Sequence, residues 1–188
     1  MTTAERRPMR ADARRNYERL LTEAKSAFLE HGAEAPLEDI ARRAGVGIGT
    51  LYRHFPTRLA LQEAVYHDEV DELCARAYAF LESEPEGEAL AAWMRSFSRY
   101  ATSRRGLMQT LKEVIDRRSD LFDRCHDEIR EAAGVVLAAA QAAGTVRPEV
   151  TAPDLLRLTH GLSVATEHAP ESADRLLSFL MDGLRPQK

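Results

Sequence analysis

The residues best suited to bind another molecule lie in one stretch, residues 37–55, with the sequence LEDIARRAGVGIGTLYRHF. In its second half, Leu51 and Phe55 fall one helical turn apart and therefore share one face of a helix. The opposite face offers a hydroxyl, a guanidinium and an imidazole, from Thr50, Arg53 and His54. Such groups, beside glycines that let a backbone approach closely, are typical of a helix that enters a DNA major groove.

A shorter helical pattern before this helix completes a helix-turn-helix. Its apolar positions are Leu37, Ile40, Ala41 and Ala44, with Pro36 at the first helical position. Gly45 supplies the backbone freedom expected just past a helix end, and Gly47 permits an immediate restart. On spacing alone, an ordinary helical corner with a solvated polar face would give the same pattern.

The literal residues distinguish between these two interpretations. The run GVGIGTLYRHFPTRLAL closely resembles the recognition helix and following helix start of the TetR family of bacterial transcriptional regulators. Together with a helix expected from about Ala13 to His31, the resemblance covers roughly residues 10 to 75. It implies a homodimer that binds a palindromic operator in double-stranded DNA, represses transcription and is released by a small-molecule effector.

The resemblance also implies roles for single side chains of this region. The residues expected to approach base edges are Ile48, Gly49 and Arg53. Arg53 is the best candidate for reading a base, because a guanidinium can engage guanine O6 and N7 together. Residues expected to contact phosphates are Thr50, Tyr52, His54 and Arg58. Arg14 and Arg15 lie where an N-terminal arm could follow the phosphates. Ala35 and Pro36 depart from the family, which often has Thr or Ser here to cap the helix and donate to a phosphate.

Composition and charge fit a DNA-binding head on a helical body. The chain is 44% hydrophobic and 30% charged, which is typical of a globular protein, and it contains no apolar run long enough to span a bilayer. Residues 1–58 contain 11 Lys and Arg against 8 Asp and Glu, although the whole chain has a net charge of −4. The N-terminus lacks a secretory pattern, so we expect a cytoplasmic protein. Cys74 and Cys125 have no paired metal-type spacing and are expected to be reduced packing residues.

The remaining pattern predicts an all-α fold, with about nine helices in total and no alternation typical of strands. We expect a basic arm and helix-turn-helix domain over residues 1–58, and an effector-binding and dimerisation domain over residues 59–188. From Arg58 to about Leu81 one unbroken helix changes its apolar face partway, which predicts that it contacts two cores. Loops are expected at residues 83–88 and after Gly144.

Aromatic residues concentrate in the predicted body, and the family resemblance implies that they line a pocket for an apolar or amphipathic effector. The predicted lining residues are Trp93, Phe97, Tyr100, Met108, Phe122, His126 and His160. The same stripe at helical spacing is also the pattern of an ordinary hydrophobic core.

The last two predicted helices have apolar residues on more than one face. Thr151 to Asp154 predicts a capping box at the start of the first, and Ser172 is expected to cap the second. Such surplus apolar surface predicts a four-helix dimer interface, although it could also complete the core of a monomer. The predicted interface residues are Leu155, Leu158, Leu162, Ala165, Leu176, Phe179 and Leu180.

Two other classes of function remain to be compared with a DNA-binding regulator. An all-α enzyme would need converging acids, nucleophiles or ligands, and pairs such as His67 and Asp68 lack the spacing of a helical metal site. We therefore expect no catalytic residue, metal or other cofactor. A helical adaptor that binds only proteins is the alternative, and salt-dependent binding to random duplex DNA would exclude it. The expected partners are DNA, a second copy of the chain and an effector, but no membrane.

Overall fold

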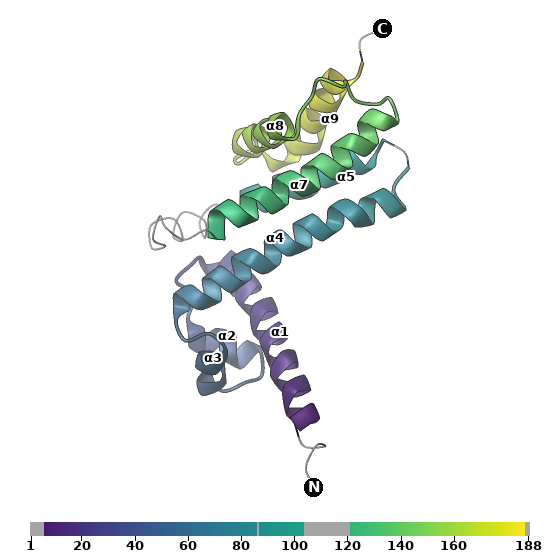
Figure 1. The fold of residues 1–188 in the computed structure, drawn as a ribbon. Coiled ribbons are helices and arrows are strands. Elements are labelled where there is room, and N and C mark those ends of the chain that lie inside the picture. Colours follow the sequence, from purple (N-terminus) through teal and green to yellow (C-terminus); the bar gives the residue numbers. More distant parts are fainter. Residues whose placement is uncertain (1–5, 86, 104–120, 187–188) are drawn as a thin grey trace. The chain divides into compact units, whose positions relative to one another are not determined.

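The computed structural model describes residues 6–85, 87–103 and 121–186, and all regular structure in these residues is helical (Figure 1). The predicted all-α class is therefore confirmed. The α-helices are α1 (Arg6–His31), α2 (Leu37–Arg43), α3 (Ile48–His54), α4 (Arg58–Ser83), α5 (Ala89–Ser103), α7 (Leu121–Ala142), α8 (Ala152–Ala165) and α9 (Ala173–Leu184). The short helix predicted just after Gly106 lies outside the described residues.

The described chain divides into two units, and the division falls between His67 and Asp68, inside α4. The sequence placed this boundary at residue 58, where α4 begins. The difference follows from the change of apolar face along the helix. Leu61 and Val65 are buried in its first part, which belongs to unit 1, and Leu73 is buried in its second part, which belongs to unit 2.

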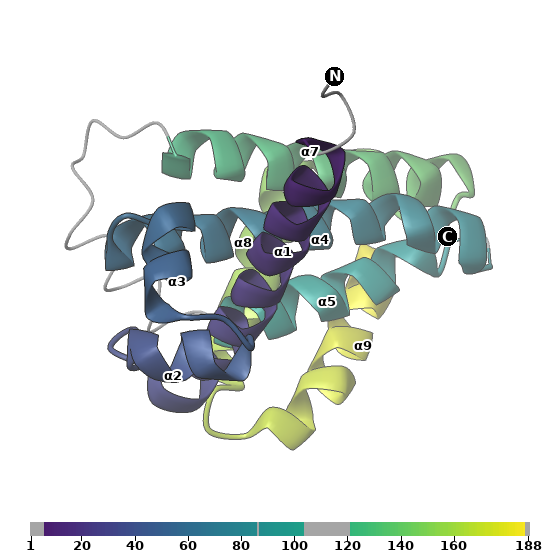
Figure 2. The same ribbon diagram turned by 90° about the horizontal axis from the view of Figure 1, so that it is seen from below.

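In unit 1, α2 packs against both α1 and α3 (Figure 2). Gly45 ends α2 with a φ of 68°, a conformation that favours glycine. Its N–H donates to the Arg42 carbonyl, and the Val46 N–H reaches back to the Ala41 carbonyl at 3.0 Å. These two bonds form a Schellman motif, which satisfies the last carbonyls of α2 and turns the chain toward α3.

Charged side chains join α1 to α2. Arg43 donates to Glu30 on α1 and to Asp39 on α2, each at 2.8 Å. Arg42 also pairs with Asp39, and the two arginines, Arg42 foremost, hold the pKa of Asp39 below its usual value. Arg42 and Arg43 are therefore occupied by carboxylates within unit 1.

Two helix starts in unit 1 differ from the sequence predictions. Helix α1 begins at Arg6 and not near Ala13, so the expected arm is helical from that residue on. Pro36 is the N-cap of α2 and not its first helical residue, with extended backbone at φ −62° and ψ 125°. No side chain caps α2, as the Ala35-Pro36 pair implied.

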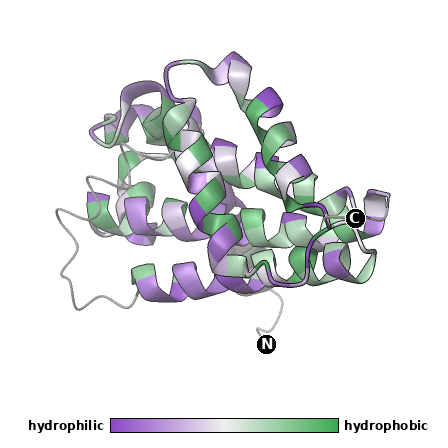
Figure 3. Cartoon of the chain, turned by 90° about the horizontal axis from the view of Figure 1, so that it is seen from above, coloured by the Kyte–Doolittle hydropathy of each residue, from purple (hydrophilic) through white to green (hydrophobic). Residues whose placement is uncertain are grey.

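Unit 2 is built around Trp93 on α5. Its side chain is fully buried, and its indole Nε1 donates to the Leu73 carbonyl on α4 at 3.0 Å. The indole ring stacks on Phe97 with ring centroids 5.6 Å apart. Helix α5 packs against α7, α8 and α9, and Figure 3 shows hydrophobic and hydrophilic residues along the same helices. Amphipathic helices of this kind bury one side and leave the other for solvent or a partner.

The capping predictions have mixed outcomes. Thr151 and Asp154 form the predicted capping box, since each side chain accepts a bond from the backbone N–H of the other. The Thr57 hydroxyl caps α4 by accepting from the Ala60 N–H at 3.0 Å. Ser172 does not cap α9 with its side chain, because it already belongs to a 3₁₀ turn over Pro170–Ser172. Within the described residues, every helix is too short or too polar to cross a membrane.

Candidate nucleic-acid interface

Two buried side chains of unit 1 set the orientation of α3. Leu51 is fully buried and Phe55 is 3% exposed. The Phe55 ring packs against Tyr17 on α1, with ring centroids 5.1 Å apart. Because α3 is only seven residues long, these contacts and not its own propensity determine its position.

The exposed face of α3 is rotated slightly from the predicted one. Gly49, Tyr52 and Arg53 are exposed, whereas Thr50 and His54 are only partly so. The His54 ring lies edge-on to Tyr17 at 6.0 Å, and this contact turns it toward the body of unit 1. Tyr52 is 46% exposed and belongs to the outward face.

Several predicted base-contacting positions of α3 are open to an incoming molecule. Ile48 is 37% exposed at the first turn. A Cβ added at Gly47 or Gly49 would meet no atom within 4 Å outside its own immediate backbone. Glycine at these positions therefore leaves space beside the helix that the protein itself does not fill.

Arg58 makes contacts within unit 1 that the sequence did not predict, while its phosphate contact stays a prediction. Its Nη1 donates to the Ala35 carbonyl at 2.6 Å and to the Ala33 carbonyl at 3.2 Å. Gln62, one turn later on α4, also donates to Ala33 at 2.8 Å. Arg58 thus holds the loop between α1 and α2, whereas the resemblance implied a phosphate contact.

Arg14 and Arg15 lie on α1 with exposed side chains. Arg14 pairs with Glu18 at 2.8 Å, and Arg15 pairs with Asp12. Exposed pairs one turn apart are weak, so a phosphate could replace either carboxylate. Both residues stay predicted phosphate contacts.

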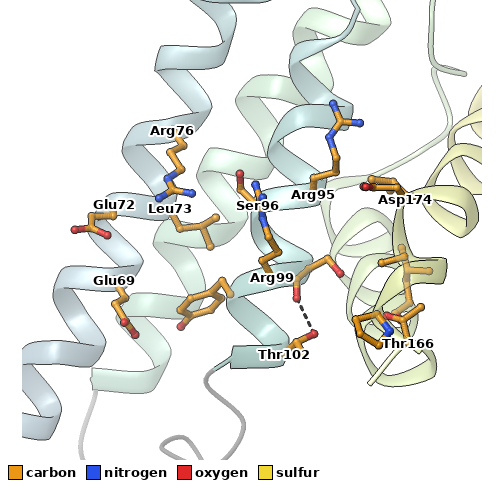
Figure 4. Close-up of a pocket in the computed structure, with 16 residues that line it drawn as sticks. Glu69, Glu72, Leu73, Arg76, Arg95, Ser96, Arg99, Thr102, Thr166 and Asp174 are labelled. Atoms are coloured by element: carbon orange, nitrogen blue, oxygen red, sulfur yellow. Dashed lines mark hydrogen bonds between the residues drawn. The ribbon is translucent and has the colours of Figure 1, made fainter. Parts of the chain in front are cut away.

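The predicted effector residues are only partly brought together in unit 2. A pocket with a cavity volume of about 750 Å³ lies between α4, α5, α8 and α9 (Figure 4). Of the predicted set, Tyr100 lines it among the described residues, and Met108 falls outside them. Predicted residues that do not line this pocket are Trp93, Phe97, Phe122, His126 and His160.

Two residues of the aromatic stripe, Trp93 and Phe97, are buried in the core. Most of the residues that line the pocket have polar or charged side chains, and sequence reasoning missed them. Three arginines contribute, Arg76 from α4 and Arg95 and Arg99 from α5. The sequence signal that could have indicated this pocket is the pair Arg95 and Arg99, which lie one turn apart on a helix whose other face is buried in the core.

The predicted dimer residues also separate into two groups. Leu155 is fully buried and Leu162 is 9% exposed within their own chain, so these two predictions were wrong. Their helix packs them against α5 and α7, and the same periodicity cannot distinguish a core from an interface. The remaining predicted residues retain exposure, and Phe179 is 60% exposed. These residues are Leu158, Ala165, Leu176, Phe179 and Leu180.

Two smaller features of unit 2 bear on chemistry. A carboxylate oxygen of Asp71 on α4 lies within 4.8 Å of one of Glu128 on α7, and oxygen donors of this kind suit hard cations. Burial raises the pKa of Cys74 to about 12, so its thiol stays protonated, as expected of a packing residue.

Helix α3 follows a Schellman turn, is anchored by two buried side chains, and has an arginine and a tyrosine facing outward. This arrangement defines a helix-turn-helix protein. Residues 20–65 match the family described as bacterial regulatory proteins, tetR family. Residues 84–186 match a family described as transcriptional regulator SbtR-like, C-terminal domain. The chain belongs to the TetR family of transcriptional regulators, whose members are regulators and not enzymes.

Solved structures of TetR regulators resemble the whole chain. The TetR transcriptional regulator SCO0520 from Streptomyces coelicolor is 39% identical, with a TM-score of 0.82 over 92% of this chain and 99% of that one. A TetR regulatory protein from Mycobacterium vanbaalenii is 38% identical, with a TM-score of 0.78 over 95% of this chain and 100% of that one. An HTH-type transcriptional regulator of Staphylococcus aureus is 39% identical over 70 residues, which cover 36% of each chain. The match thus spans about a third of that relative's length.

Proposed function

We propose that the chain is a repressor that binds a palindromic operator as a homodimer and leaves it when a small molecule occupies the pocket of unit 2. The observation that carries this proposal is the outward face of α3, where Arg53 and Tyr52 stand opposite the buried Leu51. A guanidinium in this place can read guanine in the major groove.

Contacts to the DNA backbone are expected around this helix. Tyr52, Thr50 and His54 can donate to phosphates from α3, and Arg14 and Arg15 from α1. His54 would reach a phosphate only from its exposed edge, because its ring rests against Tyr17. Arg58 supports the site indirectly by holding the loop before α2.

The homodimer is expected to form through the exposed apolar residues of α8 and α9. Leu158 is 45% exposed, Val164 48% and Phe179 60%. Gly161 and Ala165, one turn apart on α8 and both exposed, would let a second backbone approach closely. A two-fold dimer built on this surface would present two copies of α3 to two half-sites.

Release by an effector would act through α4. Glu69, Leu73 and Arg76 of this helix line the pocket, and residues before His67 on the same helix pack in unit 1. A ligand that binds one arrangement of α4 better than another would shift the population toward it.

Selection of bound fragments from a random DNA pool tests the proposal. A palindrome with half-sites about one helical turn apart, or a multiple, is expected. Arg53→Ala should cost about 1 to 3 kcal/mol and relax the preference at one position of each half-site. Equal weakening on all sequences would instead assign Arg53 to a phosphate. Absence of salt-dependent binding to any duplex would overturn the proposal and favour a protein-binding adaptor.

A further inference from the structure

Three arginines with exposed side chains line the pocket of unit 2. Arg76, Arg95 and Arg99 line it, and within the described ranges no ion pair joins any of them to a carboxylate. Glu69 and Glu72 also line the pocket, but they have interaction partners of their own. Within the described residues the three guanidinium groups are therefore not held in ion pairs, although the carboxylates of Glu69, Glu72 and Asp174 line the same pocket.

Two of these arginines come from different helices. Figure 4 shows the guanidinium groups of Arg76 on α4 and Arg99 on α5 between these two helices, whereas the Arg95 side chain runs away from both. An anion placed between the Arg76 and Arg99 guanidinium groups can accept charge-assisted hydrogen bonds from both. Guanidinium is also the group best matched to the geometry of a carboxylate or phosphate.

The opposite wall of the pocket offers apolar side chains beside the polar Thr166 and Asp174. Leu162 from α8 and Leu177 from α9 face it, and the 3₁₀ turn adds Pro170. The cavity volume of about 750 Å³ is in the range of sites that enclose a drug-sized molecule. A bare inorganic ion would leave this wall without a partner.

We propose that the pocket binds an amphipathic anion, a small molecule whose acidic head group lies between Arg76 and Arg99 and whose apolar part packs against α8 and α9. This inference deepens the proposed effector role and rests on it. The head group is a carboxylate or a phosphate, since both suit the same pair of guanidinium groups.

Two fluorescent probes with one aromatic body separate charge from apolar contact. 1-Anilinonaphthalene-8-sulfonate carries an anionic group, and N-phenyl-1-naphthylamine lacks it. Arg76→Gln and Arg99→Gln should each weaken binding of the sulfonate about tenfold or more, the loss expected for a hydrogen bond to a charged partner. Binding of the neutral probe should change less than about twofold.

Arg130→Gln is the matched control, because Arg130 is an exposed arginine on α7 that does not line the pocket. It should leave both probes unaffected. Ala173→Trp, which fills the pocket from α9, should exclude both probes, and circular dichroism verifies that each variant is folded. The inference fails if the pocket arginines affect both probes equally, if Arg130→Gln has the same effect, or if Ala173→Trp leaves binding intact.

Competition then identifies the head group. Decanoate and decyl phosphate should displace the sulfonate probe at lower concentrations than 1-decanol, and the better of the two names the preferred head group. Equal displacement by 1-decanol would overturn the inference. Operator binding is measured with the same compounds. If the anions bind at the arginines and the operator is still held, the ligand chemistry stands and the proposed release fails. If only uncharged compounds release the operator, the proposed release stands and the proposed anionic head group is wrong.

Discussion

Replacing Arg58 with alanine distinguishes a structural role from a role in DNA binding. The Nη1 atom of Arg58 donates to the carbonyls of Ala35 and Ala33, at 2.6 and 3.2 Å. Hydrogen bonds from a charged donor contribute about 1.5 to 3 kcal/mol each. Gln62 still reaches Ala33 in the variant, so the loss is dominated by the shorter bond to Ala35. We expect the free energy of unfolding to fall by about 2 kcal/mol.

Thermal unfolding measures this loss directly. In a chain of this size, about 2 kcal/mol corresponds to a decrease in Tm of roughly 4 to 8 °C. Operator binding is then measured well below this temperature at several salt concentrations. The slope of log affinity against log salt should match that of the native chain, because no phosphate contact is lost.

Arg53→Ala is the control with the opposite expected pattern. Its side chain is exposed on α3, and it should leave the free energy of unfolding within about 0.5 kcal/mol while weakening operator binding. If Arg58→Ala instead leaves Tm unchanged and lowers the salt slope by about 0.9, Arg58 contacts a phosphate and the structural interpretation is refuted.

Four further substitutions test other parts of the chain. Gly49→Ala should raise stability by up to about 1 kcal/mol yet weaken operator binding, since the added methyl meets only an incoming ligand; unchanged affinity would argue against close approach. Thr151→Ala should cost about 1 kcal/mol in denaturant unfolding. Thr151 holds the pKa of Asp154 below its usual value, so the stability from this bond is present at neutral pH and lost as pH falls through the lowered pKa, a dependence that Asp154→Asn should flatten. Phe179→Glu should yield monomers in sedimentation without loss of helicity, and persistent dimers would place the interface elsewhere.

Local chemistry explains why parts of the fold could be predicted. The end of a helix at Gly45 and the capping box of Thr151 and Asp154 were both predicted from residues that are neighbours in the sequence. Both predictions were confirmed. The anchor of α3 by Leu51 and Phe55 also follows from spacing within one turn.

Other features depend on which helices meet, and spacing does not contain that information. The orientation of His54 depends on Tyr17, which is distant in the sequence. The partners of Arg58 are backbone carbonyls of another loop. The pocket combines Arg76 and Arg99 from separate helices, whereas Trp93 and Phe97 of the aromatic stripe belong to the core.

Helix α8 separates the residues that hold the fold from those available to a partner. Leu155 and Leu162 face inward, whereas Leu158 and Ala165 stand outside on the same helix. Substitutions at the outer positions can therefore accumulate without loss of the folded state. If the proposed dimer forms on this face, such substitutions let related regulators diverge in pairing preference and avoid mixed dimers.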